Sequence, residues 1–212
     1  MTLRIRIATA LAASALAVMA TLPASAASAI FGVNLVADGN FEQAPVNMDA
    51  SKTVVAPGWT FNGGMTVLSY GASGGYLAPG SPGPSDRGRN YVSGGVDSTS
   101  SGQQSISLAS GAAKIDGGSA GYTLSAWLGG WGGQSDYATL SVAFLDSSGR
   151  TLATATIGGK PSSAFPVAEL LSHSTHGIVP KGARSVRILM TAVREEGSWN
   201  DGSIDDASLV LH

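Results

Sequence analysis

The stretch YATLSVAFLDSSGRTLATATI, residues 137–157, decides the fold class of this sequence. Apolar Leu140, Val142 and Phe144 alternate with small or polar residues in its first part, which is the period of a half-buried strand. The segment DSSG at residues 146–149 indicates a tight turn, and residues 151–157 form a second strand-like run. Two such runs joined by a tight turn predict a β-hairpin, and therefore antiparallel β structure.

Other segments repeat this alternation. From Tyr122 to Leu128, every second side chain is apolar and shares one face. No segment shows convincing helical spacing. Many short strands separated by glycine-rich turns predict an all-β protein with a β-sandwich. Further strands are predicted at residues 65–69, 103–108, 185–193 and 203–211.

The N-terminus has the features of a secretory signal peptide. Arg4 and Arg6 precede an uncharged apolar run over residues 7–22, and Ala-Ser-Ala follows at residues 24–26. A membrane anchor is the alternative, but the run barely reaches spanning length and ends at a small-residue cleavage site. We therefore expect residues 1–26 to be removed, leaving no membrane span and a protein that is secreted, periplasmic or extracellular.

The remaining residues 27–212 are predicted to form one β-sandwich domain. The stretch 71–90 is dense in Gly, Pro and Ser and is expected to be a surface loop, because residues 33–70 are too few to bury a separate core. Without the two leader arginines, 10 basic residues stand against 14 acidic ones, which argues against a nucleic-acid partner. The chain has no cysteine and therefore no disulfide. Its sequence does not predict an oligomeric state.

Three short motifs resemble a known family. NLVADGNFE at 34–42 resembles the opening strand of galactose-binding-like jelly rolls, the fold of many bacterial secreted carbohydrate-binding modules. APGW at 56–59 is similar to an element that often follows, and IDDASL at 204–209 to the closing strand. The resemblance implies a jelly-roll β-sandwich that spans nearly the whole mature chain. The middle of the sequence, including residues 71–90, departs from the better-known sugar-binding modules.

The closing motif carries a carboxylate that is predicted to be buried, and burial of a charged group costs free energy. Asp205 is in phase with Ala207 and Leu209, which are expected to face the core, and a lone carboxylate there is costly unless it is neutralised or paired. The resemblance implies a structural calcium held by Glu42 and Asp205. Because calcium takes six to eight oxygens, backbone oxygens or Asp38 would complete the shell. The alternative is a bulge that reverses the phase and leaves both acids solvated.

Two glycine-bounded loops carry groups that suit a sugar. Residues 129–136 join two predicted strands, and residues 197–202 precede the last one. An indole ring can stack on the apolar face of a pyranose while amides and carboxylates bind its hydroxyls. Alternatively, the tryptophans fold back as lids on the sandwich and residues 200–202 are only a turn. The candidate platforms are Trp131 and Trp199, and the candidate hydrogen-bonding residues are Gln134, Asp136, Asn200 and Asp201.

The sequence gives little support to an enzyme. G-x-S-x-G occurs at 71–75 and 117–121, but a nucleophile elbow needs a strand before it and a helix after it. The adjacent Glu195 and Glu196 would point to opposite faces of a strand, whereas glycoside hydrolysis needs two facing carboxyls. His173 and His176 lack an evident third zinc ligand and are expected in a solvated loop.

The sequence as a whole predicts a secreted, non-catalytic protein similar to carbohydrate-binding modules, with a polysaccharide or glycan as partner and calcium as a structural ion. A different class of function stays open beside it. A cell-surface or extracellular-matrix adhesion or structural protein could use the same fold for protein contacts and have no sugar site.

Overall fold

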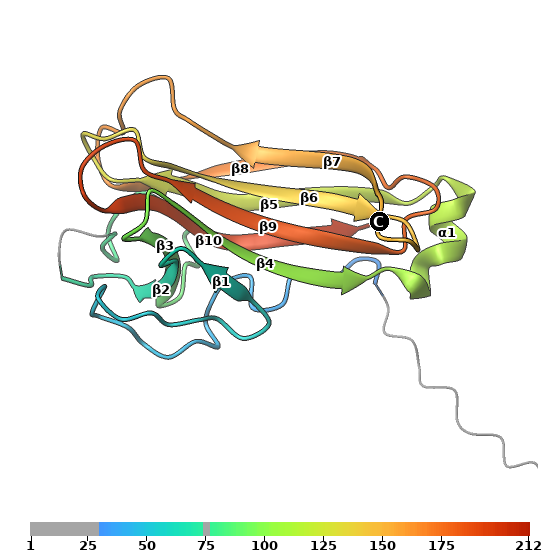
Figure 1. The fold of residues 1–212 in the computed structure, drawn as a ribbon, viewed down its shortest axis with the longest axis horizontal. Coiled ribbons are helices and arrows are strands. Elements are labelled where there is room, and N and C mark those ends of the chain that lie inside the picture. Colours follow the sequence, from blue (N-terminus) through green and yellow to red (C-terminus); the bar gives the residue numbers. More distant parts are fainter. Residues whose placement is uncertain (1–29, 74–76) are drawn as a thin grey trace, which may run out of the picture.

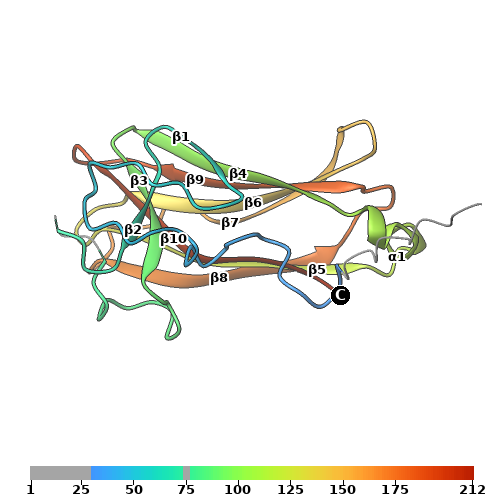
Figure 2. The same ribbon diagram turned by 90° about the horizontal axis from the view of Figure 1, so that it is seen from below.

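The computed structural model describes residues 30–73 and 77–212, so the predicted signal peptide lies outside the described residues. Two five-stranded antiparallel sheets face each other (Figures 1 and 2). The first sheet has the order β1 (Thr60–Asn62), β4 (Thr99–Ser107), β9 (Ser185–Val193), β6 (Tyr137–Leu145) and β7 (Thr151–Gly158). The second has the order β2 (Thr66–Ser69), β3 (Asn90–Gly95), β10 (Asn200–Leu211), β5 (Gly121–Gly130) and β8 (Glu169–Ile178). The predicted all-β sandwich is confirmed.

The hairpin of residues 137–157 forms as the alternation predicts. β6 pairs with β7 in antiparallel register, with Leu140 opposite Ile157 on the core side. In the turn, Oδ1 of Asp146 accepts hydrogen bonds from the amides of Ser148 and Arg150 at 2.9 and 3.0 Å. Gly149 has a φ of 82°, which a residue with a side chain rarely adopts. The turn chemistry therefore fixes the register of the pair.

Three predictions about local structure need correction. The segment with His173 and His176 is not a loop, because it forms β8 and pairs along its length with β5. A short helix, α1 (Ala112–Gly117), follows a single 3-10 turn (Ala109–Gly111) at one end of the sandwich, where the sequence shows no helical spacing (Figure 1). β3 is also additional; its six residues are all buried, so alternation does not reveal it.

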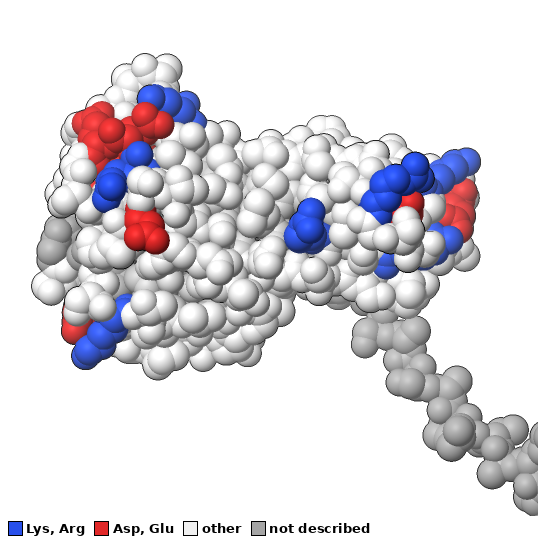
Figure 3. Space-filling model, in the orientation of Figure 1, with Lys and Arg blue, Asp and Glu red and all other residues white. Residues whose placement is uncertain are grey.

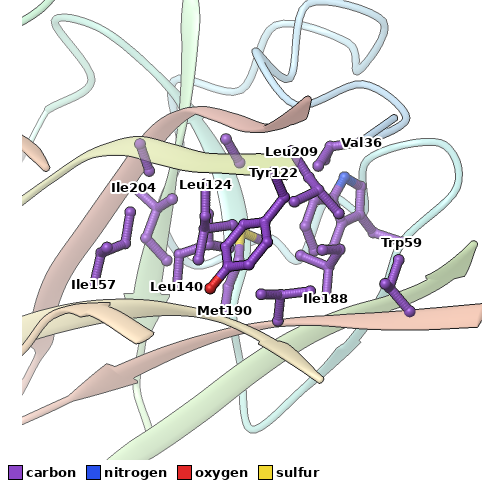
Figure 4. Packing of buried hydrophobic residues seen from close by; sticks show 14 of the residues in the cluster. Val36, Trp59, Tyr122, Leu124, Leu140, Ile157, Ile188, Met190, Ile204 and Leu209 are labelled. Atoms are coloured by element: carbon purple, nitrogen blue, oxygen red, sulfur yellow. The ribbon is translucent and has the colours of Figure 1, made fainter. Parts of the chain in front are cut away.

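The main core lies between the sheets. Figure 4 shows Leu124 and Ile204 from the second sheet facing Leu140 and Ile188 from the first. Trp59 closes this core, and its indole nitrogen donates to the carbonyl of Ala37 at 2.9 Å. The motifs at the two ends of the domain meet here. Leu35 donates its backbone N–H to the carbonyl of Leu209 at 2.9 Å.

A second, smaller cluster covers part of the outer face of the second sheet. We call it the outer cluster. Trp127 of β5 packs against it from the sheet below. The predicted loop contributes to this cover, since residues 71–73 and 77–89 form no strand or helix, while Leu77 is buried. The cluster consists of Leu68, Tyr70, Leu77, Tyr91 and Leu170.

In the described ranges 30–73 and 77–212, no helix has the length and apolar character needed to cross a bilayer.

Candidate functional site

The structure brings the two predicted sugar loops together at one end of the sandwich. β5 neighbours β10 in one sheet, and β6 neighbours β9 in the other, so the β5–β6 and β9–β10 connections lie side by side. Asp136 joins them. Its Oδ1 accepts hydrogen bonds from the amides of Glu195 and Glu196 at 2.7 and 2.9 Å, and its Oδ2 accepts one from Asp201 at 3.0 Å.

Asp136 and Asn200 are framework residues and do not face a ligand. Both are 0% exposed. Asn200 donates from Nδ2 to the carbonyls of Asp97 and Ala192 at 3.1 and 3.0 Å, and its Oδ1 accepts from Gly202 at 3.2 Å. The expectation that these two side chains bind sugar hydroxyls therefore needs correction, because their polar atoms are already used to shape the loops.

Trp131 and Asp201 lie together at the surface. They line a shallow depression of about 10 Å³ with Tyr91, Ser203 and Leu77. Both are half-buried, so each still offers some surface to a ligand. Burial, and secondarily the charge of Asp136, raises the pKa of Asp201 to about 6. The carboxyl is therefore ionised above about pH 6 and protonated below it.

Trp199 and Gln134 occupy different positions from Trp131. Trp199 is half-buried, its indole nitrogen is inside the protein, and it is not one of the described residues that line the depression. Oε1 of Gln134 is buried and has no hydrogen-bond partner among residues 30–73 and 77–212. The structure thus separates the two predicted platforms: Trp131 lines the depression, whereas Trp199 does not and has its indole nitrogen buried.

The β7–β8 connection, residues 159–168, also contributes to this end of the sandwich, although its sequence does not predict this. Phe165 fastens it to the Trp131 loop, donating its amide to the carbonyl of Gln134 at 2.9 Å and accepting from Gly133 at 2.7 Å. Nζ of Lys160 lies 2.6 Å from Oε2 of Glu195 in the β9–β10 loop. Figure 3 shows acidic and basic side chains gathered at this end of the molecule. No alternation or motif in residues 159–168 marks these contacts in advance.

Among the predicted calcium ligands, Glu42 is engaged by Arg89. Its Oε1 accepts the backbone amides of Arg89 and Asn90 at 2.7 and 2.8 Å. Its Oε2 pairs with Nε of Arg89 at 3.2 Å. Three N–H groups therefore satisfy this carboxylate, and the contact ties the opening motif to the start of β3.

Asp205 is buried, but on the face opposite to the one that the sequence predicts. It lies across from Trp127, while Ile204 lies across from Leu128 of the core. The register shifts between Asp205 and Ser208, so a bulge returns Ala207 and Leu209 to the core. The predicted phase was wrong for this reason. The alternative of a bulge is correct about the phase, but Asp205 is not solvated.

Two polar contacts hold Asp205 under the outer cluster. Its Oδ2 accepts a hydrogen bond from the hydroxyl of Tyr70 at 2.6 Å, and its Oδ1 accepts the amide of Asp206 at 2.7 Å. Burial above all raises the pKa of Asp205 to about 8, with smaller effects in the same direction from Asp206 and Glu42. At neutral pH the carboxyl is therefore largely protonated.

Asp38, the third predicted ligand, has a free oxygen. Its Oδ1 accepts the amide of Gln43 at 3.1 Å, and its buried Oδ2 has no partner among the described residues. Within ranges 30–73 and 77–212, no group of three or more His, Cys, Asp or Glu side chains is arranged to hold a metal. As arranged, Glu42, Asp205 and Asp38 do not form a calcium shell. The calcium site stays a prediction.

Comparison with known proteins places the fold. No protein-family model matches the sequence, and no curated protein matches it significantly. The architecture is the jelly-roll β-sandwich of carbohydrate-binding modules, as the end motifs predicted. The chain is similar to TmCBM61, solved in complex with β-1,4-galactotriose, with a TM-score of 0.50 and 15% identity over 85% of this chain and 100% of that one.

Two further solved structures are similar at lower scores. The enzymatically active domain of bacteriophage CBA120 tailspike protein 4 gives a TM-score of 0.49 and 19% identity over 84% of this chain, which spans 21% of that protein. The C-terminal family 22 carbohydrate-binding module of Clostridium thermocellum Xyn10B gives 0.45 and 15% identity, over 87% of this chain and 96% of the module.

Proposed function

We propose that this is a secreted, non-catalytic carbohydrate-binding protein that holds a glycan chain at the Trp131–Asp201 depression. The observation that supports the proposal most directly is the junction of the two loops through Asp136. That carboxylate fixes the β9–β10 loop against the β5–β6 loop and places Trp131 and Asp201 on one surface. The β5–β6 loop contributes Trp131 to the depression, and the β9–β10 loop contributes Asp201.

The depression suits a sugar for simple chemical reasons. A half-buried indole presents an apolar face for the C–H side of a pyranose. Asp201 accepts hydroxyl hydrogens when it is ionised, and Ser203 lies beside it. Because the depression is shallow, it favours a stretch of chain lying across the surface. Support for the choice of ligand class comes from TmCBM61, whose complex contains β-1,4-galactotriose.

A binding role is favoured over catalysis by the state of the carboxylates. Glycoside hydrolysis requires two carboxyl groups on opposite sides of the scissile bond. Asp136 is fully buried and accepts three N–H groups, so Asp201 is the only carboxylate among the described residues that line the depression. One such group can orient a hydroxyl but cannot supply both the acid and its partner.

The test is retention of residues 27–212 on a panel of soluble and insoluble polysaccharides that includes β-1,4-galactan. We expect retention by at least one of them and its loss in Trp131→Ala, with Trp199→Ala losing less because Trp199 does not line the depression. Asp201→Asn should also weaken retention, while the matched control Asp97→Asn, on the adjacent exposed turn, should not. Retention on none of the polysaccharides would favour the adhesion alternative. Unchanged retention in Trp131→Ala would exclude this depression as the sugar site.

A further inference from the structure

A second and larger hollow opens at the same end of the sandwich, between the edge strands β7 and β8. Its volume is about 300 Å³. Gly158 and Gly159 form part of the wall with positive φ values of 79° and 124°, so the chain turns away from β6 at this point. A side chain at Gly158 would collide with the carbonyl of Ala138 and with Leu128. This part of the wall therefore accommodates only glycine. The apolar lining side chains are Leu128, Ala138, Pro161, Phe165 and Leu171.

Each polar side chain of this cavity can donate a hydrogen bond, and the hydroxyls of Tyr137 and Ser162 can also accept one. Tyr137, Lys160, Ser162 and His173 line it, and no carboxylate or amide side chain does so within the described part of the chain. Lys160 remains at the mouth through its contact with Glu195. That contact is exposed and therefore weak, so the ammonium group can also donate to a ligand.

The cavity and the Trp131–Asp201 depression are separate. Gly129 lines the cavity and the next residue, Gly130, lines the depression. The ring of Phe165 lies against Gly130 and closes the cavity on that side. One stretch of β5 therefore lies between the depression and the cavity, and Trp131 does not line the cavity.

We infer that this cavity binds the terminal residue of a neutral glycan chain. The inference rests on the proposed carbohydrate-binding function. Ligand cavities begin at about 300 Å³, so this one has room for a sugar ring, and the Phe165 ring blocks a chain from continuing toward the depression. Apolar walls suit the C–H groups of the ring, and the donors suit its oxygen atoms. Glu195 and Glu196 beside Lys160 disfavour an anionic sugar by like-charge repulsion.

The chain offers two matched pairs of variants. His173 and His176 both lie on β8, but only His173 lines the cavity. Ser162 and Ser163 are consecutive exposed residues, and only Ser162 lies at the mouth. His173→Ala removes a donor and Ser162→Trp fills the opening, while His176→Ala and Ser163→Trp make the same changes outside the cavity.

The measurement is calorimetric titration in the Trp131→Ala background, where the cavity is the remaining sugar site. The probes are the disaccharides and tetrasaccharides of β-1,4-galactose, xylose and glucose, with digalacturonate as the anionic probe. For at least one of the three neutral sugars, we expect the disaccharide and the tetrasaccharide to bind with the same affinity, because only the terminal residue enters the cavity. His173→Ala should weaken binding about tenfold, as expected for one lost hydrogen bond, and Ser162→Trp should abolish it. The two control variants should bind as the background does.

Three results would overturn the inference: binding that Ser162→Trp leaves intact, affinity that rises with chain length, or digalacturonate binding as tightly as the neutral sugars. The proposed depression fails separately, through polysaccharide retention that Trp131→Ala leaves unchanged while Ser162→Trp abolishes it. That outcome supports the cavity. Absence of binding by any neutral probe to either the background or the unsubstituted protein would overturn the cavity as well.

Discussion

The hydroxyl of Tyr70 donates a 2.6 Å hydrogen bond to Oδ2 of Asp205, joining residues that are 135 positions apart in the sequence. Tyr70 follows β2, Asp205 lies on β10, and β3 separates the two strands. The contact sits under the outer cluster, where Arg87 covers the Tyr70 ring at 5.0 Å from its centroid. A carboxyl group is thus held inside the protein, away from the main core, by a hydroxyl and a backbone amide.

This burial predicts that the domain is more stable in mild acid than in mild base. The pKa of Asp205 is raised from 3.8 to about 8 in the folded protein. The unfolded chain ionises near pH 4 and the folded one only near pH 8, so the stabilisation is complete below about pH 4 and is lost as pH rises to 8. Asp201 and Asp206, each raised to about 6, add to the loss between pH 4 and 6.

Thermal unfolding in chelator should therefore give a lower Tm at pH 8 than at pH 6, by at least about 2 °C, the effect of roughly 1 kcal/mol in a domain of this size. Asp205→Asn imitates the protonated carboxyl and should flatten the profile in this window. Asp49→Asn, whose side chain is 48% exposed, is the control. A Tm that rises from pH 6 to pH 8, or an equally steep profile in Asp205→Asn, would contradict the assignment.

Calcium binding is a separate prediction, and the same residues test it. If calcium joins Glu42 and Asp205, the ion competes with Arg89 for Glu42, and its binding must ionise Asp205. An ion present at about 100 times its Kd would stabilise the fold by about 2.7 kcal/mol, or several degrees in Tm. Melting at pH 7 with calcium and with chelator measures this shift, and Asp205→Ala should remove it. No shift, or the same shift in Asp205→Ala, would rule out the predicted ligands.

Asp136 is predicted to govern both stability and binding, although its side chain is fully buried. Asp136→Ala leaves three backbone N–H groups without their acceptor at a buried position. A hydrogen bond to a charged group contributes about 1.5–3 kcal/mol to stability. Because water can reach some of the freed N–H groups, we expect the free energy of unfolding to fall by about 3 kcal/mol in total. Urea unfolding measures it.

The control for Asp136→Ala is Ser135→Ala, whose hydroxyl bonds to the exposed Glu196 and should contribute less than about 1 kcal/mol. At urea concentrations where Asp136→Ala is still folded, its retention on the polysaccharide should be lower than that of the unsubstituted protein, because the loop that carries Asp201 is released. Stability equal to that of Ser135→Ala would show that Asp136 does not fasten the loops.

The alternation of apolar and polar side chains predicted the hairpin closely, because buried and partly exposed residues alternate along the whole of β6. β6 spans Tyr137–Leu145, the limits that the sequence indicated. The same reasoning failed at Asp205, since a bulge adds a residue without leaving a mark in the pattern. It also failed for β8, an edge strand with mostly polar, partly exposed residues. Fully buried β3 was missed because its faces do not alternate.

The candidate site was predictable in its composition but not in its geometry. Glycine-bounded loops with tryptophan and acidic residues predicted a site where the structure brings these two loops together. Which side chains face outward depended on the order of strands in the sheets. That order makes Asp136 and Asn200 internal ligands of the backbone and leaves Trp131 and Asp201 at the surface. Two acids that look alike in sequence, Asp136 and Asp201, therefore have different roles.

Under the proposed function, the pKa of Asp201 makes glycan binding depend on pH in a defined direction. Burial and the neighbouring Asp136 raise this pKa to about 6, so the carboxylate that we propose as the acceptor of sugar hydroxyls is present above pH 6 and lost below it. A protonated carboxyl keeps one acceptor oxygen but loses the charge-assisted bond, which is roughly twice as strong as a neutral one. Affinity for the retained polysaccharide should therefore fall about threefold to tenfold from pH 7 to pH 5.

Asp201→Asn should bind the polysaccharide weakly at both pH 7 and pH 5, with an affinity that does not change with pH. This result would distinguish the Asp201 carboxyl from other groups that titrate. Asp97→Asn should keep the fall. The measurement is affinity electrophoresis or calorimetry at pH 5, 6 and 7, with circular dichroism to show that the fold persists at each value. An affinity that is constant in the unsubstituted protein, or that still falls in Asp201→Asn, would mean that Asp201 does not hold the sugar. The ligand would then be bound by Trp131 and neutral groups alone.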